Sequence, residues 1–567
     1  MSVGIIGSGP AIGAVKAALA DVDVDANWID TAALEEVNVA VVAGQAGDAV
    51  FERVNERALA AGVRWLAIEL GGVGGIPIVD AAVAGFGPET GCYECLAGRV
   101  NANLDPDTEP TAAAPPAHTG RFAGAVAGRE LARHLRDGAD VFGRVVEVPY
   151  TEREFLPLPN CACDPGQERA LSREHVDRTL EESLGRAERA LDELLGIVQE
   201  VGEAESFPVP YYLAHGCDTA GFSDASAARN AAGVAAGWDA AFMKALGEAL
   251  ERYCAGVYRT GEMETGPPAT TEDVVEPSAF VCETDPDPET EIHWIEGKNL
   301  ATTGRVKLPA EFVHYPPPNE RYRSPITTGL GLGNSSVEAL LAGLYEVIER
   351  DALMLSWFST FEPLGLAIDK EAFETLAARA GSEGLDVTPL LVTQDVDIPV
   401  VAVAVHGDEW PQFALGSDAD LDVTNAATSA LAEALQNWME LRGMGQEGAT
   451  EAMGAIGRYA SFPDSVRAFV EPETVIPSDS AGPQEVGVGT AELQTVLDRV
   501  DDAGLDAYAA RTTTRDVASL GFEAVRVLVP EAQPLCFGSM YFGERAREVP
   551  ADLGFKPDFD RDHHPFP

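Results

Sequence analysis

Three segments in the larger, C-terminal part of the chain each hold two polar side chains three residues apart. The pairs are, in chain order, Glu248 with Glu251, Glu346 with Glu349, and Glu433 with Gln436. The surrounding residues follow a helical pattern, and residues i and i+3 lie on one face of an α-helix. Each segment therefore presents two oxygen ligands side by side, an arrangement suited to hard metal cations.

The neighbours of these pairs are apolar, for example Leu246 and Leu250 in the first segment and Leu344 and Ile348 in the second. A carboxylate in such surroundings needs a partner, because burying an unpaired charge is costly. One interpretation is that the glutamates pair with nearby arginines or are solvated. The other is that they converge on one cavity. Three occurrences in one chain favour a shared cavity that binds Mg²⁺ and phosphate oxygens, as in phosphoryl transfer.

Arg252 and Arg350 directly follow the first two pairs, where each could meet a phosphate group. Familiar phosphate-binding sequences are not found. No lysine follows the glycine spacing of a Walker A loop, and no protein-kinase catalytic loop is present. ATP in this region would therefore bind without a known phosphate loop.

The first 70 residues alternate short apolar runs with helical patterns. Strands are expected at residues 3–6, 27–29, 37–42 and 65–70, with helices at residues 11–20 and 50–61. This βαβ pattern predicts a parallel sheet.

A glycine-rich turn, Gly7-Ser-Gly9, follows the first expected strand, and Asp30 ends the second. This is the layout of a nucleotide-binding first turn. The third glycine arrives one residue late, at Gly13 instead of Ile12. The segment is therefore either a working nucleotide site or a structural turn, and the spacing favours the structural turn.

Residues 104–120 are rich in Pro, Ala, Asp and Thr and are expected to form a loop. A helical apolar pattern over residues 173–199 predicts one long helix with a buried face. We place the domain boundary before it, which gives domains of residues 1–168 and 169–567. The predicted fold class is α/β, with a Rossmann-like parallel sheet first and an α+β domain after it.

The three polar segments resemble the ATP-site motifs of the YcaO family. The third motif, Ser-x-x-x-Glu-x-x-Gln, matches fully at Ser429, Glu433 and Gln436. The second, a serine followed by Glu-x-x-Glu-Arg, matches through Arg350. The stretch before it, which contains Ser335, is similar to the glycine-serine approach of the family.

The first motif departs from the family pattern at one position. Ala245 stands where the family has serine, whereas Glu248, Glu251 and Arg252 remain. Similarity continues through residues 516–530, which include Arg526. The resemblance therefore covers roughly residues 170–567 and implies a YcaO-type ATP-binding catalytic domain.

The sequence ends with His563-His-Pro565-Phe-Pro567. Azoline-forming members of the family are similar to one another in ending with Pro-x-Pro-x-Pro, and here His563 replaces the first proline. The resemblance implies that this segment lies in the active site, where His563, Pro565, Pro567 and the free carboxylate act as base or positioning elements. The alternative is a solvated, frayed tail.

The N-terminal part resembles a degraded activating domain of the ThiF/MoeB type. Cys92 and Cys95 are similar to the first half of the structural zinc site of that family, and Cys161 and Cys163 would form the second half with a tighter spacing than usual. Four thiolates in two pairs make a closed tetrahedral site that stabilises a fold by cross-linking two segments of the chain. The alternative is four reduced cysteines without a metal.

The resemblance implies an ATP- and Mg²⁺-dependent enzyme that phosphorylates a backbone amide oxygen, so that a Cys, Ser or Thr residue of a ribosomal peptide cyclises to an azoline. The implied Mg²⁺ ligands are Glu248, Glu251, Glu346, Glu349 and Glu433. The implied nucleotide-binding residues are Arg252, Ser335, Arg350, Ser429, Gln436 and Arg526.

Three other functions are compatible with parts of the sequence. Thioamidation by external sulfide would use the same ATP site. A non-catalytic scaffold would bind the precursor peptide, although mutually repelling carboxylates do not help a binding module. An NAD-dependent enzyme would use the N-terminal glycines. The expected partners are the precursor peptide, a separate leader-peptide-binding or sulfur-delivery protein, and a second copy of the chain in a homodimer.

Composition sets the remaining expectations. The 567 residues are 46% hydrophobic, enough for packed cores, and the apolar runs are too short to span a bilayer. We therefore expect a cytoplasmic protein without a membrane segment. The scattered excess of 92 acidic over 39 basic residues fits a surface adapted to high salt and argues against binding nucleic acid. Eight cysteines without a secretion signal do not indicate a disulfide scaffold.

Overall fold

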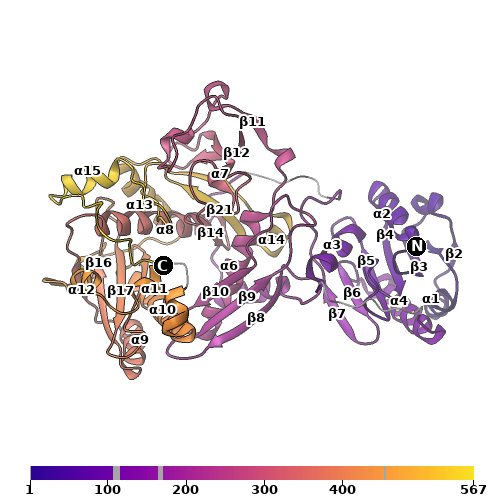
Figure 1. Cartoon of the computed structure of the whole chain (residues 1–567). Coiled ribbons are helices and arrows are strands. Elements are labelled where there is room, and N and C mark those ends of the chain that lie inside the picture. The colour runs from indigo at the N-terminus through magenta and orange to yellow at the C-terminus, as the bar shows by residue number, and fades with distance from the viewer. Residues whose placement is uncertain (1, 106–114, 164–165, 167–169, 452–454) are drawn as a thin grey trace.

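The computed structural model describes residues 2–105, 115–163, 166, 170–451 and 455–567 (Figure 1). Its first sheet has seven strands in the order β2-β1-β3-β4-β5-β6-β7. These are β1 (Val3–Ile6), β2 (Ala26–Trp28), β3 (Val39–Gln45), β4 (Arg64–Leu70), β5 (Ala81–Phe86), β6 (Arg144–Glu147) and β7 (Thr151–Glu154). The first four strands pair in parallel, as the sequence predicts, and β5 to β7 extend the sheet in antiparallel fashion.

Helices cover both faces of this sheet. On one face, α1 (Pro10–Ala20) and α4 (Ala117–Asp137) share an apolar core with β1, β3 and β4. On the other face, α2 (Ala49–Ala61) and α3 (Tyr93–Asn103) pack around Phe51, Trp65 and Tyr93. The predicted α/β class and the two predicted helices of this domain are confirmed.

The glycine turn before α1 has a structural explanation. A Cβ atom on Gly7, which has φ of +108°, would lie 2.3 Å from the carbonyl oxygen of Ala43 on β3. Asp30 accepts hydrogen bonds from the backbone nitrogens of Ala32 and Ala33, so its carboxylate caps the short 3-10 helix at Thr31–Glu36. Both residues are thus used in building the turn, which supports the structural interpretation.

The prediction of one long helix over residues 173–199 is wrong. Residues 170–179 have no regular structure, α5 spans only Leu180–Ala187, and β8 begins at Val198. A capping box of Thr179 and Glu182 starts the helix late. The apolar residues of the pattern do not form one buried face, since Leu195 is buried whereas Leu180 is 43% exposed.

The expected loop at residues 104–120 is described only in part, because residues 106–114 lie outside the described residues. At its far end α4 begins at Ala117, so the loop is shorter than predicted. The predicted domain boundary falls between β7 and α5, next to residues 167–169, which are also not described. The division into residues 1–168 and 169–567 therefore stays a proposal.

The C-terminal part contains three further sheets, with strand orders β10-β9-β8, β11-β12-β20-β21-β14 with β13 on β12, and β18-β17-β16-β15-β19. The first has β8 (Val198–Glu205), β9 (Tyr211–Gly216) and β10 (Asn230–Val234). The second has β11 (Glu264–Gly266), β12 (Ile292–Asn299), β13 (Arg305–Pro309), β14 (Leu330–Gly333), β20 (Tyr508–Arg511) and β21 (Glu523–Leu528). The third has β15 (Leu364–Ala367), β16 (Asp386–Leu391), β17 (Val400–His406), β18 (Phe413–Ala419) and β19 (Val475–Pro477).

Three long helices connect these sheets, and each carries one of the polar segments. They are α6 (Trp238–Gly256), α8 (Ser336–Trp357) and α10 (Val423–Glu451), the last of which is kinked at Gly445. Helix α6 contacts β9, β10, β14 and β21, and α10 packs on β17 and β18. Helix α8 shares one apolar core with both the second and the third sheet, which explains why its residues are hydrophobic on nearly every face. The remaining helices are α7 (Ala310–Val313), α9 (Glu371–Ser382), α11 (Ala455–Tyr459), α12 (Asp464–Val470), α13 (Thr490–Asp502), α14 (Arg515–Leu520) and α15 (Arg545–Asp552).

A buried ion pair fastens the N-terminal sheet domain to the rest of the chain. Arg99 of α3 donates to Asp516 of α14, and both side chains are 0% exposed. Tyr253 of α6 donates to the same carboxylate at 2.7 Å. Figure 1 shows α3 and α14 facing each other at this junction. Within the described residues, no helix is both long enough and apolar enough to cross a membrane.

Candidate active site

Each of the three C-terminal sheets turns one edge strand toward the polar segments. The edge strands are β10, β14 and β18. In β10 and β18, and directly before β14, a backbone N–H donates to the Oε2 atom of a motif glutamate: Ala232 to Glu248 at 2.8 Å, Gly329 to Glu346 at 2.9 Å, and Ser417 to Glu433 at 2.7 Å. The N–H groups along a sheet edge need acceptors, so these hydrogen bonds supply an acceptor to each edge N–H and fix one oxygen of each carboxylate. The glutamates are thereby aimed at one region from three directions.

Glu349 is held by a side chain instead. The Ser417 hydroxyl donates to Glu349 Oε1 at 2.7 Å, and Arg350 Nε lies 3.6 Å from the same oxygen. Because the backbone of Ser417 also binds Glu433, this residue joins the second and third motifs.

Burial and like charge raise the carboxyl pKa values in this cluster. Burial raises the pKa of Glu251 to about 8, and the nearby Glu346 adds to the rise. Burial raises the pKa of Glu349 to about 7, with Arg350 opposing the rise and Glu433 adding to it. The pKa of Glu433 is raised as well, mainly by burial. The structure thus places the five predicted glutamates close enough for their charges to interact, and a bound cation would stabilise their charged forms.

Two arginines beside the cluster have a buried N–H group without an acceptor among the described residues. Arg252 binds Glu248 Oε1 at 2.6 Å through one Nη atom, but its Nε is buried and unpaired. Arg526 donates to the carbonyl oxygens of Thr327 and Ile326 at 2.9 and 3.0 Å, and its Nε is likewise unpaired. A buried donor without an acceptor is costly, so both sites fit an anionic ligand such as a phosphate group.

Burial, reinforced by the positive charge of Arg323, lowers the pKa of Arg526 to about 9. An anion bound there would reverse this effect.

The remaining predicted nucleotide ligands have mixed placements. Ser429 is half-buried on α10, and Gln436 donates to Glu440 at 3.0 Å. Ser335 is buried, and its hydroxyl accepts a hydrogen bond as the N-cap of α8. Ala245, which replaces the serine of the family, is fully buried where α6 crosses β10, and a Cβ atom on Gly233 would lie 2.2 Å from its backbone nitrogen. Position 245 therefore serves close packing in this chain.

The last residues of the sequence are docked rather than frayed. Arg350 donates to the carbonyl oxygen of Pro567 at 2.8 Å, which places Pro567 beside the second motif. Phe566 is 0% exposed and packs against Trp357 and Phe469 with ring centroids 6.3 Å apart in each case. Trp357 donates to Asp562, and Tyr459 donates to the carbonyl oxygen of His563.

Pro565 is buried within this docked segment. The imidazole of His563 turns to the backbone of His564, with Nδ1 3.1 Å from its carbonyl oxygen. Of the three predicted catalytic residues of the tail, Pro567 is therefore the one that bonds to a motif side chain.

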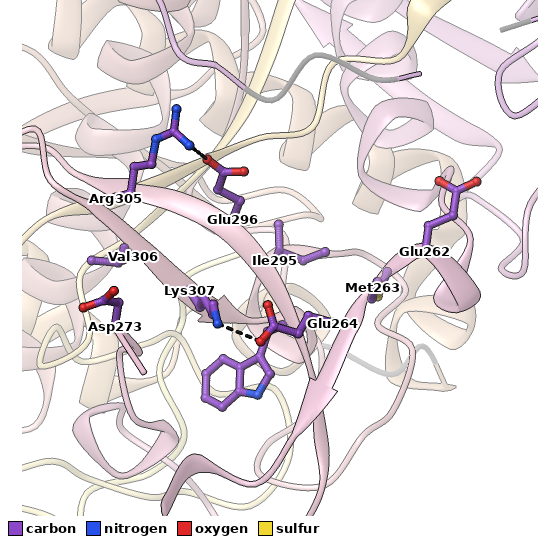
Figure 2. Close-up of a pocket in the computed structure, with 10 residues that line it drawn as sticks. Glu262, Met263, Glu264, Asp273, Ile295, Glu296, Arg305, Val306 and Lys307 are labelled. Atoms are coloured by element: carbon purple, nitrogen blue, oxygen red, sulfur yellow. Dashed lines mark hydrogen bonds and ion pairs between the residues drawn. The ribbon is translucent and has the colours of Figure 1, made fainter. Parts of the chain in front are cut away.

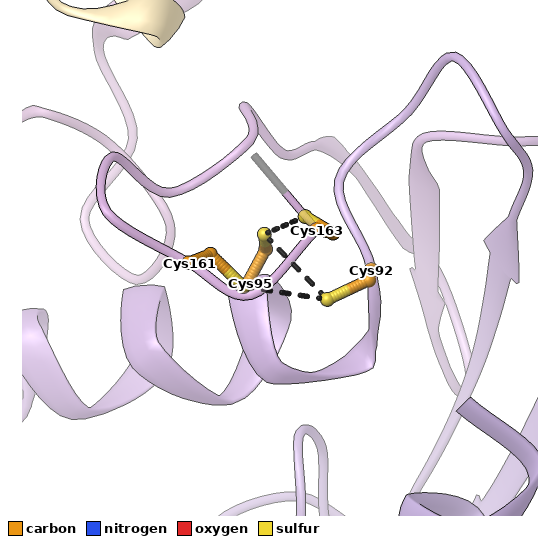
Figure 3. Close-up of side chains that lie close together, drawn as sticks. All are labelled: Cys92, Cys95, Cys161 and Cys163. Carbon is orange, nitrogen blue, oxygen red and sulfur yellow. Dashed lines mark hydrogen bonds between the residues drawn. The ribbon is translucent and has the colours of Figure 1, made fainter. Parts of the chain in front are cut away.

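The four predicted cysteines meet in the N-terminal domain (Figure 3). Their sulfur atoms all lie within 4.8 Å of one another, and all four are free thiols. Cys92 and Cys95 are held at the start of α3, and Arg515 of α14 donates to Cys163 Sγ at 3.2 Å. Two close cysteine pairs with converging sulfurs fit a tetrahedral zinc ion.

A pocket of about 400 Å³ lies apart from the carboxylate cluster, on β11, β12 and β13 (Figure 2). No motif glutamate lines it. Its two basic residues are already paired with acids of the rim, Lys307 with Glu264 at 2.7 Å and Arg305 with Glu296 at 3.3 Å. We assign no catalytic role to this pocket.

Sequence reasoning missed Ser417, the backbone donors at the sheet edges and the interdomain pair of Arg99 with Asp516. Their contacts depend on which strands lie at sheet edges and which helices meet, and neither appears in a local pattern. The one available signal was Gly416-Ser417 shortly before the third motif, where Gly416 lets β18 approach the backbone of α10.

Comparison with known proteins agrees with the motifs. The sequence model of the family described as YcaO cyclodehydratase, ATP- and Mg²⁺-binding, matches residues 232–533. An uncharacterized protein of Methanothermobacter thermautotrophicus is 29% identical over 316 residues, which are 53% of this chain and 81% of that protein.

Two solved structures share the fold across nearly the whole chain. A heterocyclase in complex with substrate and cofactor superposes with a TM-score of 0.74 at 20% identity, covering 98% of this chain and 83% of that one. The heterocyclase TruD has a TM-score of 0.65 at 19% identity, covering 98% and 81%. The likeness therefore includes the N-terminal domain. The chain belongs to the YcaO cyclodehydratase family, whose members bind ATP and Mg²⁺, and is an ATP-dependent enzyme of that family.

Proposed function

We propose that this enzyme phosphorylates a backbone amide oxygen of a ribosomally made peptide and so cyclises a Cys, Ser or Thr residue to an azoline. The observation that carries the proposal is the cluster of five glutamates from α6, α8 and α10 beside two buried arginine Nε–H groups that have no acceptor among the described residues. Such a cluster suits Mg²⁺ together with the phosphates of ATP.

The roles of the side chains follow from their contacts. Glu248, Glu346 and Glu433 each keep one oxygen on a sheet edge, which leaves the other oxygen to face a cation or a neighbouring side chain. The Nε–H groups of Arg252 and Arg526 would donate to phosphate oxygens. Mg²⁺ held by the carboxylates would neutralise the charge of the triphosphate.

The neighbouring residues would complete the nucleotide site. Ser429 and Gln436, on the α10 turns next to Glu433, would orient the nucleotide. Ser335 is a further predicted ligand and also starts the helix that carries Glu346 and Glu349.

The proposed reaction has three steps. The substrate thiol or hydroxyl adds to the carbonyl carbon of the preceding amide and loses its proton to a base, which leaves an oxyanion. The oxyanion attacks the γ-phosphorus of ATP, so an O–P bond forms and ADP leaves. The amide nitrogen then expels phosphate and loses its proton, giving the C=N bond of the azoline, ADP and inorganic phosphate.

Thioamidation by external sulfide would use the same ATP site. The docking of Pro567 on Arg350 supports ring closure, because Pro565 and Pro567 resemble two of the three alternating prolines that end azoline-forming members of the family. Delivery of the peptide by a separate leader-binding protein and homodimerisation are parts of the same proposal.

A nucleotide-binding experiment at high salt tests the proposed function. The wild type should bind ATP only with Mg²⁺, and Glu349→Gln, which keeps the size but removes the charge, should lose this binding. Glu473→Gln, on an exposed glutamate outside the cluster, is the matched control and should bind normally. Wild-type protein that binds no ATP would overturn the proposal.

A further inference from the structure

Ser417 contacts glutamates of two different motif helices. Its hydroxyl donates to Glu349 Oε1 on α8 at 2.7 Å, and its backbone nitrogen donates to Glu433 Oε2 on α10 at 2.7 Å. We propose that Ser417 is a positioning residue that sets these two carboxylates as one Mg²⁺ site. This inference rests on the proposed function and adds a residue outside the three motifs.

The geometry of β18 explains how one residue reaches two helices. Side chains alternate across a strand, and Leu415 and Ala419 pack into the core that contains α8, so Ser417 points to the same face. Ala414 packs on the opposite face with α10. The N–H of Ser417 lies in the plane of the sheet, and it is free for Glu433 because β18 is an edge strand.

The two contacts differ in how they can be perturbed. Glu433 is bound by the backbone, and Asn437, one turn later on α10, donates to the carbonyl oxygen of Leu415 on the same strand at 2.8 Å. The docking of α10 on β18 therefore does not depend on the Ser417 side chain. Glu349 is bound by the hydroxyl itself, so removing that oxygen releases only Glu349 from the strand.

Within the part of the chain that the structure describes, the Ser417 hydroxyl makes the one hydrogen bond to the Glu349 carboxylate, so it sets the orientation of that carboxylate. Ser417 is 6% exposed, so no bulk water competes for the hydrogen bond. Arg350 Nε is more distant, at 3.6 Å, and its Nη1 already donates to Pro567. Loss of an outer-shell partner of a metal ligand typically weakens metal affinity by about 10- to 100-fold.

The test compares the Mg²⁺ dependence of ATP binding in full-length variants. Ser417→Ala should raise the half-saturating Mg²⁺ concentration by about tenfold or more. Ser417→Thr keeps the hydroxyl and should restore the wild-type value. Ser356→Ala is the control, because it removes another buried hydroxyl of the α8 region, one that donates to Leu353, and should leave the Mg²⁺ dependence unchanged.

Thermal unfolding without Mg²⁺ separates positioning from packing. A lower unfolding temperature of Ser417→Ala with an unchanged Mg²⁺ requirement would overturn the inference, since it would mean a purely structural role. If the alanine variant does not fold, Ser417→Cys provides the test, because a thiol is a weak donor of similar shape and should give an intermediate shift. Failure of the wild type to bind ATP with Mg²⁺ would instead refute the proposed function.

Discussion

The docked tail gives a prediction that can be worked out quantitatively. Phe566→Ala removes a ring that is 0% exposed and packs on Trp357 and Phe469. Truncating a buried phenylalanine costs about 3–5 kcal/mol. The tail is also held by the buried His564 ring and by hydrogen bonds, including Arg350 to Pro567 and Trp357 to Asp562, each with a net value of about 0.5–1.5 kcal/mol. The Phe566 ring is therefore a major anchor of the tail.

The lost free energy should weaken docking of the tail and should not destabilise the whole fold, because the docked segment is short and follows the last strand and helix. A loss of about 3 kcal/mol reduces the ratio of docked to undocked tail roughly 100-fold, since each 1.4 kcal/mol is tenfold. Among the described residues, the ring contacts of Phe566 are with Trp357, Phe469 and His564, and none is with a motif residue. ATP binding should persist, and turnover with peptide should fall in proportion to the remaining docked fraction of the tail.

Hydrogen exchange of residues 561–567 and peptide-dependent ATP turnover provide the assay. The variant should exchange fast in the tail and slowly in α8 and α10. Phe122→Ala, at a 43% exposed position of the N-terminal domain, is the control and should change neither measurement. A fast-exchanging tail with full turnover would refute the role given to Pro567, and a protected tail would refute the role given to Phe566.

Three further predictions concern the interdomain pair, the carboxylates and the cysteines. Asp516→Asn leaves Arg99 buried without its counter-charge, so the free energy of unfolding in denaturant titrations should fall by about 3–5 kcal/mol. Arg129→Gln, which breaks an ion pair with an exposed arginine, should change the free energy of unfolding little. Burial raises the pKa of Glu349 to about 7 and that of Glu251 to about 8, from an ordinary value of 4.5. Mg²⁺-dependent ATP binding should therefore strengthen as the pH rises from about 6 to about 8. Without Mg²⁺, the stability that these two carboxyl groups contribute is fully present below pH 4.5 and is lost as the pH rises through their folded pKa values. Cys163→Ser should remove the zinc that the protein retains after dialysis and should lower the unfolding temperature, whereas Cys282→Ser, outside the cluster, should change neither. Equal zinc content in the two variants would contradict the four-cysteine site.

The success of the sequence predictions depends on how local the signal is. The strands β1 to β4 and the helices α1 and α2 follow from hydrophobic periodicity, because each short element buries its own regular face. The glutamate pairs were found because a helix brings residues i and i+3 together within one element. The convergence of the pairs was inferred from their repetition, and the structure supplies the reason, namely three sheet edges that each bind one glutamate.

The misses share a different cause. The pattern over residues 173–199 has helical spacing, yet its apolar residues pack in unrelated places, and Thr179 starts the helix late. The antiparallel strands β5 to β7 and the role of Ser417 depend on pairing between distant segments, which no local pattern encodes. The alanine at position 245 likewise depends on a distant segment, because β10 crosses α6 at that point.

The most direct measurement of the central claim follows the oxygen atom of the peptide carbonyl. A Cys-containing peptide that the enzyme accepts would carry a heavy-oxygen label in the carbonyl before the cysteine, and the released phosphate would be analysed by mass spectrometry. The account predicts one labelled phosphate and one ADP for each ring formed, with loss of one water from the peptide. Ring formation with unlabelled phosphate would contradict phosphorylation of the backbone amide oxygen.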